Sequence, residues 1–378
     1  MSEWPTVKLK ELMRKTKSID PGKYPDEEFA LYSIPAYDNG IPEKIFGRDI
    51  GSSKILLKDS DVVLSKIVPH IRRTWVITDG EKQIGSSEWI VFNDDRFDPQ
   101  FIANYLKSDV FHYQLLTTVA GVGGSLNRAR PAAVAELKIP LPPLGEQKRI
   151  AEILGGAVEA EQHVQDTLEL LNEVAKSSFY TFCGIPDHFE RRKKLGEIAI
   201  VATGNTPPRK DPSNYGSYIE WIKSDNLGSI FPTPASEFLS EEGVKRGRVA
   251  APGSLLMTCI AGSIKSIGKC SVVNREVAFN QQINSIKPVN NEDLYYLYLL
   301  FYVAPYLVQR RSTGGLKGIV KKSSLEMCEI PWPERKVRQM IGTFCQEWIN
   351  CRLLVMRKLS LLQELQKSLA NRAFAGLL

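Results

Sequence analysis

The side chains in this sequence that could do chemistry are basic residues that border turns and glycine-rich loops. They form two sets, one in each half of the chain. The first set follows a short apolar run or borders the glycine loop within 120–130, and comprises Lys66, His70, Arg72, Arg73, Arg128 and Arg130. The second set follows Pro207-Pro208, lies in 262–269, which is the counterpart of 66–73, or borders the second glycine loop within 312–322. It comprises Arg209, Lys210, Lys265, Lys269, Lys317, Lys321 and Lys322.

Cations beside glycine can bind phosphate, because glycine lets backbone N–H groups approach an oxyanion while Lys and Arg supply charge. Neither glycine loop matches a nucleotide fingerprint. Leu126 stands where the third glycine of a G-x-G-x-x-G pattern belongs, and no G-K-[ST] follows. Any one of these cations can equally be a solvated surface charge, but the recurrence of basic loops in both halves favours contact with a polyanion.

Arg72 and Arg73 are the predicted base readers of the first set. The planar guanidinium group presents paired donors that match N7 and O6 of guanine, which no lysine can do. Charges on loops at the end of a sheet can converge on one duplex, so we expect the remaining cations to contact phosphate.

The sequence contains no catalytic constellation. The only double prolines, Pro142-Pro143 and Pro207-Pro208, do not fit an [ND]-P-P-[YF] methyltransferase loop. The 4 histidines lie far apart, and the 6 cysteines form no C-x-x-C pair, so we expect buried, reduced thiols. We therefore predict a non-catalytic chain that holds no metal and no cofactor.

Composition indicates a folded protein of two or three domains. The 378 residues are 43% hydrophobic and carry a net charge of +6, which permits polyanion binding without requiring it. The first residues lack the apolar core of a signal peptide, and the most apolar run, 294–308, is interrupted by Pro305. We expect a cytoplasmic protein that does not enter a membrane.

Two long helices are predicted to position the loops. The stretch 139–184 opens with Ile139-Pro140-Leu141-Pro142 and then carries apolar or small residues in steps of four and three from Ile150 to Phe182. Ile330-Pro331-Trp332-Pro333 repeats this opening, and the same seam recurs from Ile341 to Ala373. A globule between the helices lets the chain reverse, so we predict that they pair antiparallel as a coiled coil.

The globules that precede the helices have a mixed pattern that predicts α/β (α+β) folds of mostly antiparallel strands. We expect strands at 61–67, 74–77 and 89–92, with counterparts at 253–260, 271–273 and 283–286, and helices at 99–116 and 291–303. Gly184 is a predicted helix C-cap. The predicted domains are 1–138 and 185–329 for the globules, and 139–184 and 330–378 for the long helices.

Several segments closely resemble the specificity subunits of type I restriction-modification systems. The proline-opened helix starts carry the likeness to their conserved regions, and other pieces are similar to their target-recognition domains. These segments are Ile139-Pro140-Leu141-Pro142-Pro143-Leu144-Gly145-Glu146-Gln147-Lys148-Arg149-Ile150, Ile330-Pro331-Trp332-Pro333, Thr203-Gly204-Asn205-Thr206-Pro207-Pro208, Tyr218-Ile219-Glu220-Trp221-Ile222 and Asn280-Gln281-Gln282-Ile283-Asn284. The second copy departs from the pattern, with Glu334-Arg335-Lys336-Val337-Arg338-Gln339 where the family often repeats Pro-Leu-x-Glu-Gln.

The resemblance implies a protein that recognises double-stranded DNA. Each globule would be a target-recognition domain that binds one half of a split site, with the paired helices as a spacer. The implied partners are two adenine methyltransferase subunits that use S-adenosylmethionine and, in the full complex, translocating restriction subunits that use ATP and Mg²⁺. Two other hypotheses remain open, namely an enzyme with diverged methyltransferase or nuclease motifs and a two-headed scaffold that binds proteins but no DNA.

Overall fold

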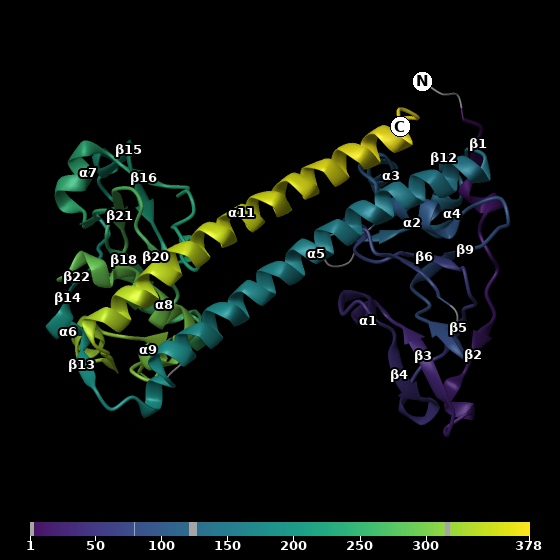
Figure 1. The fold of residues 1–378 in the computed structure, drawn as a ribbon. Helices are drawn as coiled ribbons and strands as arrows, with labels where there is room; N and C mark the ends of the chain where they lie inside the picture. Colours follow the sequence, from purple (N-terminus) through teal and green to yellow (C-terminus); the bar gives the residue numbers. More distant parts are fainter. Residues whose placement is uncertain (1–3, 79, 121–126, 314–317) are drawn as a thin grey trace. The chain divides into compact units, whose positions relative to one another are not determined.

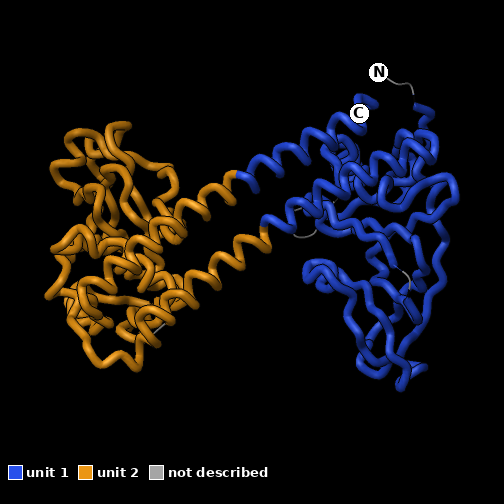
Figure 2. Tube along the Cα trace, in the orientation of Figure 1, with its two compact units in different colours: residues 1–164, 358–378 blue, residues 165–357 orange. Residues whose placement is uncertain are grey.

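The computed structural model describes residues 4–78, 80–120, 127–313 and 318–378. The chain forms two compact units (Figures 1 and 2). Unit 1 comprises Met1–Val164 and Lys358–Leu378, and unit 2 comprises Gln165–Arg357. Each unit therefore contains one globule and a part of both long helices. The sequence-based domain boundaries stay a prediction.

Unit 1 contains two main sheets. The first has the strand order β2-β5-β8-β3-β4 and the second β7-β6-β9. Two-stranded ladders, β1-β12 and β10-β11, complete the unit. The strands are β1 (Thr6–Lys8), β2 (Ser18–Ile19), β3 (Glu28–Tyr32), β4 (Glu43–Phe46), β5 (Lys54–Leu56), β6 (Val62–Ser65), β7 (Thr74–Val76), β8 (Gln83–Gly85), β9 (Trp89–Phe92), β10 (Val119–Ala120), β11 (Arg128–Ala129) and β12 (Lys138–Pro140).

Unit 2 repeats this plan with the orders β16-β15-β21-β17 and β14-β22-β18-β20, plus the ladders β13-β24 and β19-β23. The strands are β13 (Arg192–Lys194), β14 (Ala199–Thr203), β15 (Tyr215–Ile222), β16 (Phe238–Leu239), β17 (Val249–Ala250), β18 (Leu255–Thr258), β19 (Ile260–Ala261), β20 (Cys270–Val272), β21 (Val277–Phe279), β22 (Ile283–Pro288), β23 (Gly318–Ile319) and β24 (Glu329–Pro331).

The duplication seen in the sequence extends to strand pairing. β6 pairs antiparallel with β7 and β9, and β18 pairs antiparallel with β20 and β22. In the other sheet of each unit one pair is parallel, β3 with β8 and β15 with β21. The predicted α+β class and mostly antiparallel sheets are confirmed. The strands β2 to β5 were not predicted, because short runs such as Ser18–Ile19 carry little periodic signal.

Both units also contain shorter helices. They are α1 (Ile34–Asp38), α2 (Pro99–Lys107), α3 (Asp109–Leu116), α4 (Pro131–Ala135), α6 (Leu195–Ile198), α7 (Glu241–Arg246), α8 (Leu294–Val303), α9 (Tyr306–Gln309) and α10 (Lys322–Glu326). The single helix predicted at 99–116 is wrong. Ser108 has extended backbone geometry and its hydroxyl accepts a bond from Phe111 N, so the chain stops α2 and caps α3 at this residue.

The long helices are α5 (Leu144–Cys183) and α11 (Arg335–Phe374), each 40 residues. Both begin just after the proline-rich openings, because proline lacks an N–H donor and disfavours helical geometry before it. Gly184 follows α5 with φ of 73°, and its N–H donates to Tyr180 O, so the predicted C-cap is confirmed. None of the helices in the described ranges is long and apolar enough to span a membrane.

The two long helices pack antiparallel within each unit. In unit 1, Ile150 and Leu154 near the start of α5 share one apolar cluster with Ala373 and Phe374 at the end of α11. In unit 2 the other ends meet, because the end of α5 shares an apolar cluster with the first half of α11. Trp348 Nε1 of α11 donates there to Leu171 O of α5 at 2.8 Å.

The predicted seam fails at the end of α5. Phe182 was expected to be buried but is 39% exposed, whereas Phe179 and Cys183 are buried. Phe179 stacks on Tyr296 of α8, with ring centroids 6.2 Å apart. At the end of α5, packing against the globule of unit 2 therefore determines which face is buried. Ala175, Phe179 and Cys183, spaced by four, all belong to the core cluster of that globule.

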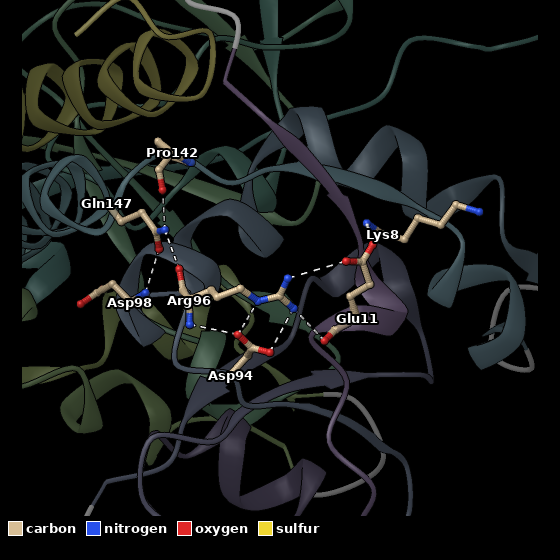
Figure 3. Close-up of polar contacts among 7 residues, drawn as sticks. All are labelled: Lys8, Glu11, Asp94, Arg96, Asp98, Pro142 and Gln147. Atoms are coloured by element: carbon tan, nitrogen blue, oxygen red, sulfur yellow. Dashed lines mark hydrogen bonds and ion pairs between the residues drawn. The ribbon is translucent and has the colours of Figure 1, made fainter.

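A buried glutamine fixes the start of α5 to its globule (Figure 3). Gln147 Oε1 accepts a bond from Asp98 N at 2.8 Å, and Gln147 Nε2 donates to Pro142 O at 2.7 Å and to Arg96 O at 3.0 Å. Arg96 also pairs with Asp94 and donates to Glu11 O at 3.1 Å. Asp98 caps α2, so the Gln147 side chain joins the start of the long helix to the start of α2.

Arg338 takes this place in the second copy. Its Nε donates to Asp293 Oδ1 at 2.7 Å and its Nη1 donates to Pro333 O at 2.7 Å, while its guanidinium lies 4.1 Å from the centroid of the Trp332 ring. Asp293 precedes α8 as Asp98 precedes α2. The second copy, which departs from Pro-Leu-x-Glu-Gln, thus keeps the attachment of helix to globule. It uses the ion pair of Arg338 with Asp293 where the first copy uses the side-chain amide of Gln147.

Candidate nucleic-acid interface

The two basic segments of unit 1 lie side by side. Ile67 forms an antiparallel bridge with Arg128, and Val68 N donates to Asn127 O at 3.1 Å. Lys66 is held from both sides, because its N–H donates to Glu88 O at 2.9 Å and its carbonyl accepts from Ala129 N at 2.8 Å. The structure therefore brings together the loop 66–73 and the segment that follows the first glycine loop.

Glu88 lies where these segments meet, and the sequence analysis missed it. Arg128 Nη2 donates to Glu88 Oε1 at 2.8 Å, and Lys66 Nζ donates to the neighbouring Ser87 O. Ser86 Oγ accepts from Glu88 N at 3.2 Å, which fixes the turn. A Ser two residues before an acidic residue is a turn signal that could have identified this position.

Arg72 and Arg73 are both engaged in ion pairs. Arg73 Nε and Nη2 donate to the two carboxylate oxygens of Asp38, at 2.7 and 2.8 Å, and its side chain is only 10% exposed. Arg72 Nη1 donates to Asp109 Oδ1 at 2.6 Å. These arginines hold the pKa values of both carboxyl groups below their usual range, mainly through the hydrogen bonds. Base readout by Arg72 and Arg73 stays a prediction, and for Arg73 it requires exchange of two hydrogen bonds.

Arg72 also adopts an uncommon backbone conformation. Its φ is 57°, in the left-handed region, and Val68 in the same loop has φ of 48°. The equivalent residue of unit 2 is Gly268, with φ of 83°. Glycine adopts this conformation without strain, whereas the arginine is kept there by Asp109 and by its bond to Lys107 O at 3.2 Å. His70 lies exposed on the 3-10 turn Pro69–Ile71 between these residues.

Unit 2 brings its two basic segments together in the same way. β19 pairs antiparallel with β23, with Ile260 opposite Ile319 and Ala261 opposite Gly318. Both Cys259 N and Ile260 N donate to Gln282 O, at 2.8 and 3.1 Å, so Gln282 takes the place of Glu88. Asn280 Oδ1 accepts from Gln282 N at 3.0 Å and closes the equivalent turn.

The basic residues of unit 2 surround this ladder. Lys265 is exposed on the 3-10 turn Ile264–Ser266, and Lys269 is exposed just before β20. Lys321 occupies the N-cap position of α10 without a side-chain capping bond, and within this helix Lys322 Nζ lies 3.5 Å from Glu326 Oε1. The prediction for Lys317 lies outside the described residues, as do 121–126 of the first glycine loop and 314–317 of the second.

The basic positions of the two units match only in part. Backbone bonds equate Arg73 with Lys269, since Ser65 N donates to Arg73 O and Thr258 N donates to Lys269 O. The bonds from Ala129 N to Lys66 O and from Val320 N to Cys259 O likewise equate Arg130 with Lys321, the next residue in each unit. The same alignment places Cys259 at the position of Lys66 and Ile319 at the position of Arg128.

Arg209 and Lys210 lie on a third segment of unit 2, after β14. Both are exposed, and Arg209 Nη2 donates to Glu237 Oε2 at 2.9 Å. Thr206, on the same segment, is hydrogen-bonded through its hydroxyl to Gln281 Oε1, which ties the segment to the turn that holds β19. In unit 1 the structure places Arg130, another predicted DNA-contacting residue, next to Thr118 O, to which its Nε donates at 3.3 Å.

The cysteines offer no reactive thiolate among the buried set. Burial raises the pKa of Cys259 and of Cys270 to about 12, which keeps both thiols protonated. Cys351 is exposed, so the expectation that all the thiols are buried is wrong for this residue. Within the described ranges, no group of three or more His, Cys, Asp or Glu side chains could hold a metal ion.

Comparison with known proteins agrees with this architecture. The family model described as type I restriction modification DNA specificity domain matches residues 1–170 and 186–363. The MjaIX specificity subunit of Methanocaldococcus jannaschii is 31% identical over 159 residues, which cover 40% of this chain and 36% of that relative. The MjaVIII specificity subunit of the same organism is 21% identical over 407 residues, which cover 99% of this chain and 92% of that relative. The match to the MjaX subunit covers 61% of that protein's length.

Two solved structures share the fold. A chain from a structure titled as the basis of complex assembly and conformational transition of the type I R-M system has a TM-score of 0.58 at 22% identity, over 100% of this chain and 99% of that chain. The S subunit of a type I system from M. genitalium has a TM-score of 0.58 at 13% identity, over 98% and 96% of the two chains. Because the family model matches both halves of the sequence, each of which folds into the same pair of sheets, the chain belongs to the type I restriction-modification DNA specificity family.

Proposed function

We propose that this chain is a DNA-recognition subunit in which each unit reads one half of a bipartite double-stranded site. The observation that carries the proposal is the pairing of two basic segments in both units, through Ile67 with Arg128 and through β19 with β23. A protein that binds a duplex twice needs the same cationic surface twice, since phosphate contacts position each reader on the backbone.

The basic positions that match between the two units, and those that do not, fit a protein that contacts phosphate in both half-sites but reads different bases in each. Arg73 with Lys269 and Arg130 with Lys321 keep positive charge at equivalent places. Lys269, Arg130 and Lys321 suit contact with a uniform phosphate backbone, whereas Arg73 is a predicted base reader and is paired with Asp38. Lys66 and Arg128 have no cationic counterpart in unit 2, where Cys259, which is buried, and Ile319 take their places, so the two surfaces differ in charge at these positions. The two halves of the site would then differ in sequence.

Removal of Lys269 and Lys321 tests the DNA surface. We expect Lys269→Ala with Lys321→Ala, in the complex with methyltransferase subunits, to weaken binding to specific and random duplexes alike. The slope of log affinity against log salt should fall in magnitude by about 0.9 for each phosphate group that the variant no longer binds. Filter binding or fluorescence anisotropy over a salt series measures this.

Lys287→Ala is the matched control, because Lys287 is exposed at the far end of β22 from the turn at 280–282. An unchanged slope in the double variant would contradict the assignment of this surface. A parent complex without salt-dependent DNA binding would favour the protein-binding scaffold. Adenine methylation or DNA cleavage by the isolated chain would favour the enzyme with diverged motifs.

The long helices carry a duplicated apolar surface for partners. Leu170 and Val174 of α5 are exposed, and so are Leu361 and Leu365, which occupy the corresponding positions of α11. One pair lies in each unit. Exposed leucine and valine at a spacing of four form an apolar stripe that another helix can cover. Two equivalent stripes favour two copies of one partner, which we assign as adenine methyltransferase subunits.

In this proposal the chemistry resides in the partners. S-adenosylmethionine would bind to the methyltransferase subunits, and ATP with Mg²⁺ to translocating restriction subunits where these join. The present chain would contribute the choice of sequence and the spacing of the two halves. Its two units are each built around a separate core, which suits a subunit that addresses two short DNA segments.

Charge substitutions on the stripes test the stoichiometry. We expect Leu170→Glu with Val174→Glu, or Leu361→Glu with Leu365→Glu, to remove one methyltransferase copy from the complex, because each places two charges in an apolar contact. The affinity at the altered stripe should fall on the order of 100-fold. Native mass spectrometry counts the copies. All four substitutions together should leave none, while Val289→Glu, an exposed control that belongs to neither long helix, should leave both.

A further inference from the structure

Arg209 is held in a setting unlike that of the other arginines near the predicted DNA surface. Its guanidinium carbon lies 5.2 Å from the centroid of the Tyr215 ring and 5.2 Å from that of Trp221. The two rings meet edge to face, with centroids 6.0 Å apart, and form a rigid apolar wall. The cation–π contacts restrict where the guanidinium can lie without using its N–H groups.

A carboxylate completes the support. Glu237 Oε2 accepts from Arg209 Nη2 at 2.9 Å, and Glu237 Oε1 accepts from Lys223 Nζ. The bond from Lys223, together with that from Arg209, keeps the pKa of Glu237 below its usual range, so this group stays charged. Trp221 N donates to Glu237 O at 2.9 Å, which fixes the carboxylate beside β15.

The backbone that carries Arg209 is also anchored. Tyr215 Oη donates to Pro207 O at 2.8 Å, two residues before Arg209. Asn214 Nδ2 donates to Pro208 O at 3.0 Å. Both anchors come from the start of β15 or the turn before it, so the position of the arginine is set by a sheet rather than by a free loop.

Although the rings, Glu237 and the anchored backbone hold it, the Arg209 guanidinium remains accessible to a ligand. Its side chain is 57% exposed, and one bond of its guanidinium goes to a carboxylate. Arg73, by contrast, is 10% exposed and gives both donors of one edge to Asp38. A guanine is recognised through two N–H groups directed at N7 and O6, and a fork that is fixed in advance loses less entropy on binding.

Arg209 also lies on the side of unit 2 where the basic segments meet. The bond between Thr206 and Gln281 joins its segment to the turn at 280–282, and Gln282 O accepts from Ile260 N of β19 at 3.1 Å. The segment of Arg209 and the ladder of β19 with β23 therefore share one supporting turn.

Resting on the proposed DNA recognition, we propose that Arg209 reads a guanine in the half-site bound by unit 2, and that Glu237 is the positioning residue that orients its guanidinium. Tyr215 and Trp221 form the wall against which the side chain is held. Lys223 balances the second oxygen of Glu237, so the carboxylate does not neutralise the arginine alone.

The test compares Arg209→Lys, Arg209→Ala and Glu237→Gln in the complex with methyltransferase subunits. The probe is a plasmid library with randomised bases, and the readout is the adenine methylation motif in the presence of S-adenosylmethionine. We expect both Arg209 variants to lose discrimination roughly 5- to 150-fold at one guanine in one half of the motif, with the other half unchanged. Glu237→Gln should relax the same position to a smaller extent.

Arg209→Lys is the decisive variant because it keeps the charge and removes the fork. If Arg209→Lys leaves the motif intact while Arg209→Ala weakens binding to all sequences, Arg209 is a phosphate contact and the inference fails. Relaxation at a base other than guanine also overturns it. Lys287→Ala, an exposed cation outside the predicted DNA surface, is the control and should leave the base preference unchanged.

The two levels of the proposal can be told apart. A parent complex that methylates without a bipartite motif would overturn the proposed function itself. A parent with a bipartite motif that the Arg209 variants share unchanged would overturn only the role of Arg209. Thermal unfolding of each variant should match that of the parent, since an exposed ion pair contributes little to stability.

Discussion

Arg338→Ala is expected to lower the free energy of unfolding by about 3–5 kcal/mol, because it leaves a buried carboxylate without its counter-ion. The Arg338 side chain is 9% exposed and that of Asp293 is 3% exposed, and they are joined at 2.7 Å. The substitution also frees Pro333 O and removes the guanidinium from the face of Trp332. Chemical denaturation of the full chain, followed by tryptophan fluorescence, measures the change.

Arg335→Ala is the control for this prediction. Arg335 lies on the same helix and pairs with Glu292 at 2.7 Å, but its side chain is 70% exposed. Its removal should cost at most about 1 kcal/mol, as is usual for surface pairs. Arg338→Ala combined with Asp293→Asn should cost less than the single substitutions added together, since the uncompensated charge is gone. Equal effects of Arg335→Ala and Arg338→Ala would refute the buried attachment.

Phe179→Ala should destabilise the protein by about 3–5 kcal/mol, because less apolar area is buried and a cavity is left behind. Phe179, near the end of α5, is fully buried against α8, where it stacks on Tyr296. Tyr296 Oη donates to Pro331 O at 2.6 Å, so the cavity would lie beside a buried hydrogen bond that cannot easily move. Thermal and urea unfolding report the change.

Phe182→Ala provides the matched comparison, because Phe182 lies one helical turn away and is partly exposed against Phe344. We expect it to cost about 1 kcal/mol, the size of an aromatic pair contact at the surface. If the two alanine variants were equally destabilising, α5 would bury the face that the sequence seam predicted. The pair of variants therefore decides which of two adjacent stripes of α5 is buried.

The sequence by itself determined the repeated plan of the chain. Prolines at 140, 142 and 143 and again at 331 and 333 dictate where the long helices can begin, and Gly184 dictates where α5 ends, because these residues restrict or free the backbone locally. The short β-rich runs that became β6, β7 and β9, with β18, β20 and β22, were also visible, since a run of several apolar residues bounded by turn residues carries its own signal.

The basic loops were visible for the same local reason, but their partners were not. Asp38, Asp109, Glu88 and Glu237 lie far from Arg73, Arg72, Arg128 and Arg209 in the sequence, and only the folded chain brings each carboxylate to its arginine. The choice of Arg72 and Arg73 as base readers rested on residue type alone, which contains no information on exposure.

Only the tertiary structure decided which face of α5 is buried and which residue fastens each long helix. A heptad seam describes two helices in contact, but Phe179 packs on the globule. A straight helix has 3.6 residues per turn, so its side chains gradually rotate away from a seam that repeats every 3.5 residues. Gln147 and Arg338 look unrelated in the sequence and occupy the same place in the fold, because the surrounding groups of each unit, a backbone N–H in one and a carboxylate in the other, determine which side chain satisfies them.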